Sequence, residues 1–189
     1  MESYRIQEDA SLYFVTFSVV DWLPVFVSEE ACSVLADSLA FCQSRKGLRV
    51  NAYVFMPTHI HMILFDAEYD PRRLSETMTA FRKYTGRMLS DFAAQHLPEA
   101  FTRVFRDAAA SGCRDPERMD RARRFWQPSR HPVALTGERM WRQKLDYLHD
   151  NPRRKGLLRY PEHWRYSSAR YYLEGPDDCG DVEVTEVEW

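Results

Sequence analysis

The chain has 189 residues, of which 44% are hydrophobic and 14% aromatic, so it can bury the core of one sizeable domain. No apolar run approaches the length of a membrane span, and no basic region followed by an apolar stretch marks a secretory signal at the N-terminus. The four cysteines lie at positions 32, 42, 113 and 179 and show neither a CxxC pair nor zinc-like spacing. We therefore expect reduced thiols in a cytoplasmic protein that has no membrane partner.

The net charge of −2 hides an uneven distribution along the chain. Residues 1–37 carry seven acids and one base, and residues 174–189 carry seven acids and no base. Residues 38–173 hold 25 Lys and Arg against 14 Asp and Glu, a net charge of +11. A basic middle between acidic ends favours a polyanion as partner, above all nucleic acid, although a solvated arginine-rich surface would have the same composition.

The first half of the chain alternates between strand and helix patterns. Aromatic and β-branched residues mark the strands, whereas Ser28 and Pro71 open helices and Gly47 ends one. The predicted elements, in chain order, are strand 12–20, helix 28–47, strand 48–55, strand 59–65 and helix 71–95. This order opens a ferredoxin-like α+β fold, an antiparallel sheet with helices on one face.

The second half is less regular. Residues 98–124 form a polar, arginine-rich segment that predicts a loop with some helix. Residues 125–127 and 133–135 are candidates for the fourth strand. Thr136 is a candidate cap for a helix that runs to about Asp150, and a C-terminal helical and aromatic extension follows it.

Two histidines stand out in the strand predicted after Pro57. His59 and His61 are two residues apart, and because a strand has a side-chain period of two, both should project from the same face. Such a pair can hold one cation or one phosphate group. Two partly buried histidines, each hydrogen-bonded to a backbone carbonyl, would have the same spacing.

Tyr84 is a second group that could carry chemistry. It lies in the long helix beside Arg82, Lys83 and Arg87, and neighbouring cations favour the phenolate form of a tyrosine. A surface tyrosine that covers apolar neighbours fits the same pattern, since the chain has 10 tyrosines.

These motifs, in this order, resemble the single-tyrosine HUH transposases (His, hydrophobic, His), and in particular the REP-associated tyrosine transposases. The residues that carry the resemblance are Met56-Pro57-Thr58-His59-Ile60-His61, Phe81-Arg82-Lys83-Tyr84-Thr85, Trp126-Gln127, Lys144-Leu145-Asp146-Tyr147-Leu148-His149-Asp150-Asn151-Pro152, Gly156-Leu157 and Trp164-Arg165-Tyr166-Ser167-Ser168-Ala169. They span roughly residues 10–172. The resemblance implies a transposase-like catalytic domain over 1–136, including the irregular segment 98–124, an extension of the same domain over 137–173, and an acidic mobile tail over 174–189.

The resemblance also implies a chemistry. Such enzymes bind single-stranded DNA with a hairpin, and they cleave and rejoin it through a 5′-phosphotyrosine with a divalent metal, Mg or Mn. By these roles, His59 and His61 are metal ligands in the catalytic centre and Tyr84 is the nucleophile, in one shared cleft. The bases expected to contact DNA are Arg82, Lys83, Arg87, Arg153, Arg154 and Lys155.

Two positions depart from the family pattern. Relatives commonly carry Gln or Asn about one helical turn after the tyrosine, where this chain has Met88, and a thioether is unsuited to a hard cation. Asp91 is a candidate substitute. Relatives also usually show Asn-Asn-Pro-Val where this chain has Asp150-Asn151-Pro152-Arg153, a change that we expect to adjust DNA contacts or local packing.

Two other functions fit parts of this pattern. A DNA-binding protein with the same fold and weak or lost cleavage is the first alternative, and Met88 is the residue that favours it. A zinc hydrolase is the second, because imidazole also suits zinc. The chain is expected to act as a monomer or a homodimer, with the monomer preferred.

Overall fold

The structure is a computed structural model that describes residues 12–110, 123–128, 132–176 and 180–188. Its centre is a four-stranded antiparallel sheet with the strand order β2-β3-β1-β4. The strands are β1 (Leu12–Ser18), β2 (Leu48–Met56), β3 (His59–Asp66) and β4 (Val133–Leu135). This confirms the ferredoxin-like α+β fold. Of the two candidate segments for the fourth strand, 133–135 forms it, whereas Trp126 makes only an isolated bridge to Val19.

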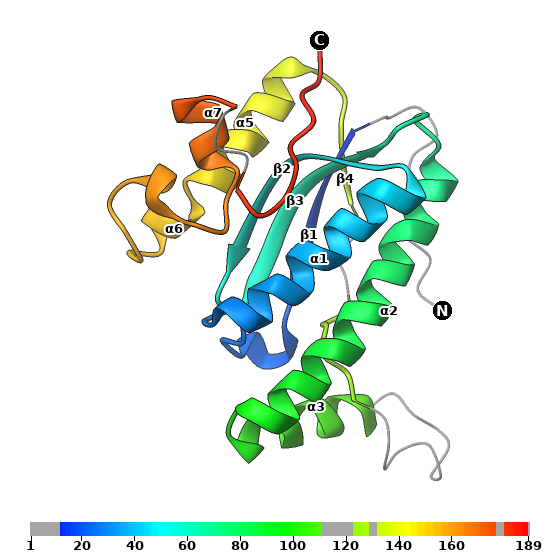
Figure 1. Ribbon diagram of the computed structural model, residues 1–189, viewed down its shortest axis with the longest axis vertical. Coiled ribbons are helices and arrows are strands. Elements are labelled where there is room, and N and C mark those ends of the chain that lie inside the picture. Colours follow the sequence, from blue (N-terminus) through cyan, green and yellow to red (C-terminus); the bar gives the residue numbers. More distant parts are fainter. Residues whose placement is uncertain (1–11, 111–122, 129–131, 177–179, 189) are drawn as a thin grey trace.

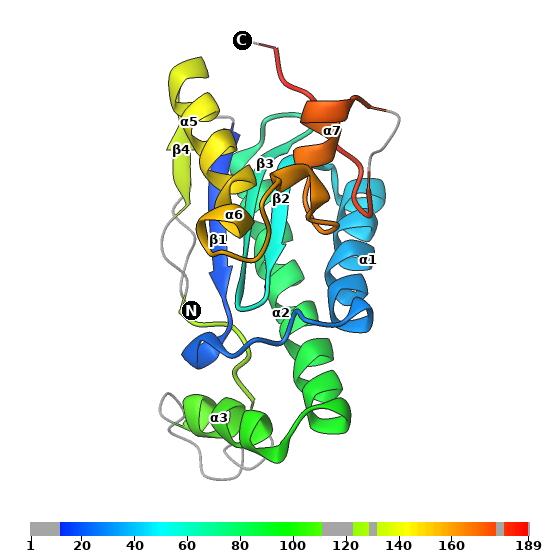
Figure 2. The same cartoon turned by 90° about the vertical axis from the view of Figure 1, so that its left-hand side faces the viewer.

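Helices lie on both sides of this sheet (Figures 1 and 2). The α-helices are α1 (Glu29–Lys46), α2 (Pro71–His96), α3 (Glu99–Ala110), α5 (Glu138–His149), α6 (Asn151–Arg154) and α7 (Ala169–Glu174), and the 3-10 turns are η1 (Val20–Trp22) and η2 (Pro161–His163). Part of the expected irregular segment is therefore the regular helix α3, and residues 111–122 lie outside the described residues. In the part of the chain described, no helix is both long and apolar enough to cross a membrane.

The helix ends follow from local chemistry. The Ser28 hydroxyl accepts a hydrogen bond from the Ala31 N–H at the start of α1, and Gly47 ends that helix with a φ of 69°, a left-handed conformation that glycine adopts at low cost. The Asp70 carboxylate caps α2. The expected cap at Thr136 is wrong, because the residue at the N-cap of α5 is Gly137, which offers no side-chain acceptor.

The two faces of the sheet form two separate cores. On one face, Phe17 of β1 stacks against Phe81 of α2 with ring centroids 6.2 Å apart, and α1 completes this larger core. On the other face, Phe14 belongs to a smaller core that Leu145 and Leu148 of α5 cover. Side chains alternate along a strand, so odd-numbered residues of β3, which include Ile63, face α5.

A bulge in β2 anchors the C-terminal part of the chain. Register shifts between Val50 and Ala52, and the intervening Asn51 side chain accepts a hydrogen bond from Trp141 Nε1 at 2.7 Å and donates to the Tyr172 hydroxyl and the Thr185 carbonyl oxygen, each at 3.0 Å. One buried amide thus joins α5, α7 and residues 180–188 to the sheet.

The described part of the acidic tail packs against the domain. Val182 is buried, and the Thr185 N–H donates to the Val50 carbonyl oxygen at 2.8 Å. The tail also packs Val184 and Val187 against the two cores, so it contributes apolar side chains and backbone hydrogen bonds as well as charge.

Candidate active site

The histidine pair has the expected geometry. His59 and His61 lie on β3 and project from the same face, with ring centroids 4.7 Å apart. Their exposed fractions are only 7% and 5%. The period of two along the strand therefore predicted their common orientation correctly.

Two threonine hydroxyls orient the imidazole rings. Thr58 Oγ1 lies 2.9 Å from His59 Nδ1, and Thr16 Oγ1 lies 2.8 Å from His61 Nδ1. Thr16 can reach His61 because the two residues pair across β1 and β3. His61 Nε2, by contrast, is buried without a hydrogen-bond partner in the described structure. A buried ring nitrogen in this state is costly unless a ligand binds it.

Both imidazoles are held in the neutral form that metal binding requires. Burial, followed by the charge of Lys155, lowers the pKa of His59 to about 4, while a hydrogen bond with Asn151 opposes that shift. Burial, followed by the charges of His59 and Lys144, lowers the pKa of His61 to about 3. At neutral pH neither ring is a positively charged imidazolium, so neither ring repels a cation.

Helices α5 and α6 bring a tyrosine and an amide to this pair. The ring of Tyr147 lies edge-on to His61 with centroids 5.4 Å apart, and it also contacts Phe14. Tyr147 remains 37% exposed, so a ligand can reach its edge. Asn151 is buried and hydrogen-bonded to His59. Tyr147 and Asn151 are four residues apart, about one helical turn, and both reach the histidines.

Cations surround this cluster. Lys144 Nζ lies 4.9 Å from the centroid of the Phe14 ring, and the Arg154 guanidinium lies 5.4 Å from the centroid of the Tyr147 ring. Lys155 is close enough to lower the pKa of His59. Arg153 is the exception in its basic run, because it pairs with Asp150. The site is therefore positively charged around two neutral imidazoles.

A strained turn supplies one more aromatic ring. Asp21 and Trp22 in η1 have φ values of 52° and 55°, a left-handed conformation that is uncommon for residues other than glycine. The Trp22 indole lies edge-on to His59 with centroids 5.6 Å apart and is 54% exposed. This turn places an exposed indole beside the histidine pair.

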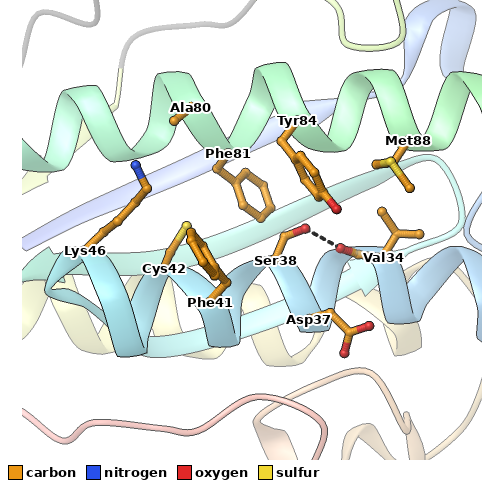
Figure 3. Close-up of a pocket in the computed structure, with 10 residues that line it drawn as sticks. All are labelled: Val34, Asp37, Ser38, Phe41, Cys42, Lys46, Ala80, Phe81, Tyr84 and Met88. Atoms are coloured by element: carbon orange, nitrogen blue, oxygen red, sulfur yellow. Dashed lines mark hydrogen bonds between the residues drawn. The ribbon is translucent and has the colours of Figure 1, made fainter.

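The expectation that Tyr84 shares this cleft is wrong. Tyr84 lies on α2, which covers the opposite face of the sheet, where Phe81 packs on Phe17. Tyr84 lines a pocket of about 430 Å³. Figure 3 shows its ring between α1 and α2, close to Met88 and Val34. The basic neighbours of Tyr84 suggested a nucleophile, but they carry no information on which face of the sheet the helix covers.

Neither Met88, at the position where relatives carry the third ligand, nor Asp91, the candidate substitute, lies at the histidine pair. Met88 lines the pocket of Tyr84, and Asp91 pairs with Arg123 at 3.0 Å. The bases Arg82, Lys83 and Arg87 line a groove beside α2 and α3, whereas Arg154 and Lys155 lie at the histidines. Of the two predicted basic clusters, only the one at positions 153–155 therefore lies near the histidine pair.

Tyr147 and Asn151 are the residues that sequence reasoning missed. The signal was present, because they have the same tyrosine-to-amide spacing of one helical turn that was expected after Tyr84 and was absent there. Four residues after Tyr147 the expected amide is present, as Asn151. What the sequence lacked was the information that α5 lies over His61.

The site offers three donors to a divalent cation. Two neutral imidazoles and the amide oxygen of Asn151 are available, with His61 Nε2 lacking any other partner in the described structure. Within the described residues, no group of three or more His, Cys, Asp or Glu could hold a metal ion. The amide oxygen and water are ligands that Mg²⁺ and Mn²⁺ prefer, whereas imidazole is a softer ligand that also suits other divalent ions.

Comparison with solved structures supports the fold. The chain resembles the structure of a REP-associated tyrosine transposase bound to a REP hairpin, with a TM-score of 0.61 and 17% sequence identity. The alignment covers 100% of this chain and 95% of that one. No protein-family model and no curated protein matches the chain.

Proposed function

We propose that this protein binds single-stranded DNA carrying a hairpin and that it cleaves and rejoins one strand through Tyr147. The observation that carries the proposal is that one tyrosine, one amide and two neutral imidazoles meet on a single face of the sheet. The hairpin-bound structure with the same fold supports a nucleic-acid substrate. Tyr147 replaces Tyr84 in the proposed role.

The reaction is a phosphoryl transfer to the tyrosine. The Tyr147 oxygen attacks the phosphorus and forms a 5′-phosphotyrosine, while the bond from phosphorus to the 3′ oxygen breaks and that oxygen becomes a free hydroxyl after taking up a proton. The phenol proton passes to solvent. Attack by a 3′ hydroxyl on the phosphotyrosine reverses the step and restores a phosphodiester, so no external energy source is needed.

His59, His61 and Asn151 would hold the metal, with Thr16 and Thr58 fixing the two rings. A divalent ion there neutralises charge on the phosphate oxygens. Lys144, Arg154 and Lys155 supply further positive charge to bind the phosphates on either side. The exposed Trp22 indole offers a surface on which a base can stack.

The test is a covalent-adduct assay with labelled hairpin DNA and Mn²⁺. Tyr147→Phe should abolish the denaturation-resistant adduct while folding and DNA affinity persist, because only a hydroxyl is lost. Tyr84→Phe is the matched control and should form the adduct at the wild-type level. The reverse pattern would refute the assignment to Tyr147.

The donor set also bears on the two alternative functions. Among the described residues, the donor set contains only two His of the ligand types that zinc prefers, which disfavours a zinc hydrolase, since catalytic zinc takes three such ligands. The same sparse donor set favours a DNA-binding protein with weak or lost cleavage. Wild-type protein that binds the hairpin but forms no adduct with any divalent metal would establish this alternative.

A further inference from the structure

A basic groove lies apart from the histidine site. It is formed by one face of α2, by α3 and by residues 123–128, with a volume of about 750 Å³. Its cationic lining residues are Arg82, Lys83, Arg87, Arg106, Arg123 and Arg124. The acid that lines it, Asp91, is paired with Arg123. Six cations against one acid give the groove a strong positive potential.

Close packing and side-chain hydrogen bonds hold the floor of the groove in place. Gly86 lets the Trp126 indole approach α2, since an added Cβ would lie 3.3 Å from the indole ring. Trp126 Nε1 donates to Thr85 Oγ1 at 3.1 Å, and both side chains are buried. The Arg82 guanidinium donates to the Gln127 carbonyl oxygen at 2.6 Å, so this cation is held at a fixed position.

The groove and the histidine pair meet at the same end of the sheet, although α2 and α5 cover opposite faces. Ser18, the last residue of β1, pairs with His59. The Gln127 N–H donates to the Ser18 carbonyl oxygen at 2.8 Å, which places the groove wall beside that strand end. A DNA strand that ran from the histidine site around the end of β1 would enter this groove.

We propose that this groove binds the phosphate backbone of single-stranded DNA that flanks the hairpin. The inference rests on the proposed function, because the flank must belong to a substrate held at the histidine site. Guanidinium groups bind phosphate oxygens through paired hydrogen bonds, which suits a groove lined mainly by arginine. Lys83 and Arg87 are exposed on α2 and are positioned to meet the backbone first.

The experiment compares two DNAs, a hairpin alone and the same hairpin with a flank of about 15 nucleotides, by fluorescence anisotropy at several salt concentrations. The variant is Lys83→Gln with Arg87→Gln. The matched control is Arg45→Gln with Lys46→Gln in the last turn of α1, outside both surfaces. Circular dichroism checks that all the proteins remain folded.

In wild type the flank should tighten binding. The groove variant should lose that gain, and its slope of log affinity against log salt on the flanked DNA should shrink by about 1.4, as expected for two lost contacts to a single strand. Hairpin binding and the control variant should stay at the wild-type level.

Three outcomes would overturn the inference. If the flank strengthens binding equally in wild type and the groove variant, the groove does not hold DNA, although the proposed function stands. If the control variant loses the same gain, general charge explains it. If wild type binds neither DNA, the proposed function fails and the inference fails with it.

Discussion

His61 shows most plainly how individual atoms at the site are prepared for a ligand. Thr16 bonds one ring nitrogen, and the other, Nε2, is buried without a partner in the described structure. Burial also keeps the ring neutral, which removes the competition between a proton and a cation. A protein that used this histidine only for packing would gain nothing from leaving a buried nitrogen unsatisfied.

Variants of Asn151 and Met88 test which position supplies the third metal ligand. Asn151→Ala should weaken Mn²⁺ binding by about tenfold or more in isothermal titration calorimetry, because the amide contacts His59. Met88→Gln should leave the affinity unchanged, since its new amide would lie in the pocket between α1 and α2. Tighter binding in Met88→Gln would instead place the metal near Tyr84.

The orientation of the two histidines was predictable from the sequence, whereas the position of Tyr147 was not, and the reason is physical. A period of two is a property of any strand, so the shared orientation of His59 and His61 follows from spacing alone. The partner tyrosine comes from an element about 80 residues later, and its position depends on which face of the sheet α5 covers. Tyr84 has basic neighbours, whereas Tyr147 has an amide one helical turn away. The spacing between tyrosine and amide was the more informative of these two patterns.

At the scale of elements, the junction between α5 and α6 positions the chemistry. Helix α5 ends at His149 and α6 begins at Asn151, with Pro152 in its first turn, where a missing N–H costs nothing. The turn at Asp150 stays near helical geometry, with φ −77° and ψ −7°. Asn151 therefore remains about one turn beyond Tyr147 and faces His59.

The bulge residue Asn51 is the anchor of the C-terminal elements. Asn51→Ala should lower the free energy of unfolding by about 2 to 4 kcal/mol, because Trp141, Tyr172 and Thr185 each lose a hydrogen bond to a buried side chain. Urea denaturation monitored by tryptophan fluorescence measures the change. Gln43→Ala is a mild control, since its single bond to Glu183 is exposed. Equal stability of wild type and Asn51→Ala would contradict the anchoring role.

Most helix and strand positions were predictable, whereas the layering was not. Ser28, Gly47 and Pro71 mark helix ends through local chemistry, and the structure confirms all three. Helix α3 was expected only as some helix within a loop, because its basic, proline-punctuated surroundings resemble a loop. The second core beneath α5 was also missed, since both faces of β2 and β3 are apolar and their sequences do not indicate which helix covers which face.

For the whole molecule, buried histidines predict a loss of stability in acid. Burial lowers the pKa of His149 to about 4, and His59 and His61 shift in the same direction. Each pKa is lower in the folded than in the unfolded protein, so the unfolded chain binds more protons between about pH 4 and 6.5. Stability is therefore full above pH 6.5 and should fall by about 1.4 kcal/mol per pH unit for each histidine below it.

Urea denaturation in EDTA at pH 7.5 and 5.0 measures this effect. His149→Gln should reduce the pH dependence by one histidine's share, and replacement of the exposed His163 by Gln is the control. An unfolding free energy that stayed constant across this pH range would contradict the neutral, buried state of these rings.

We propose that a monomer is the working unit, because His59, His61, Tyr147 and Asn151 of one chain meet in one site. If each protein molecule uses its own Tyr147 with its own His59 and His61, a mixture of His59→Ala and Tyr147→Phe should form no adduct, since neither chain carries a complete site. Light scattering should give the mass of one chain, 22.4 kDa. Restored activity in the mixture would instead mean that two chains exchange tyrosines.

The most direct test of the central assignment is to identify the tyrosine that becomes linked to DNA. Wild-type protein is incubated with hairpin DNA and Mn²⁺, the covalent product is digested with protease and nuclease, and the modified peptide is sequenced by mass spectrometry. We predict a phosphonucleotide on Tyr147, in the peptide that also contains Leu145 and Asp146. The same modification on Tyr84, with Tyr147 unmodified, would contradict the account.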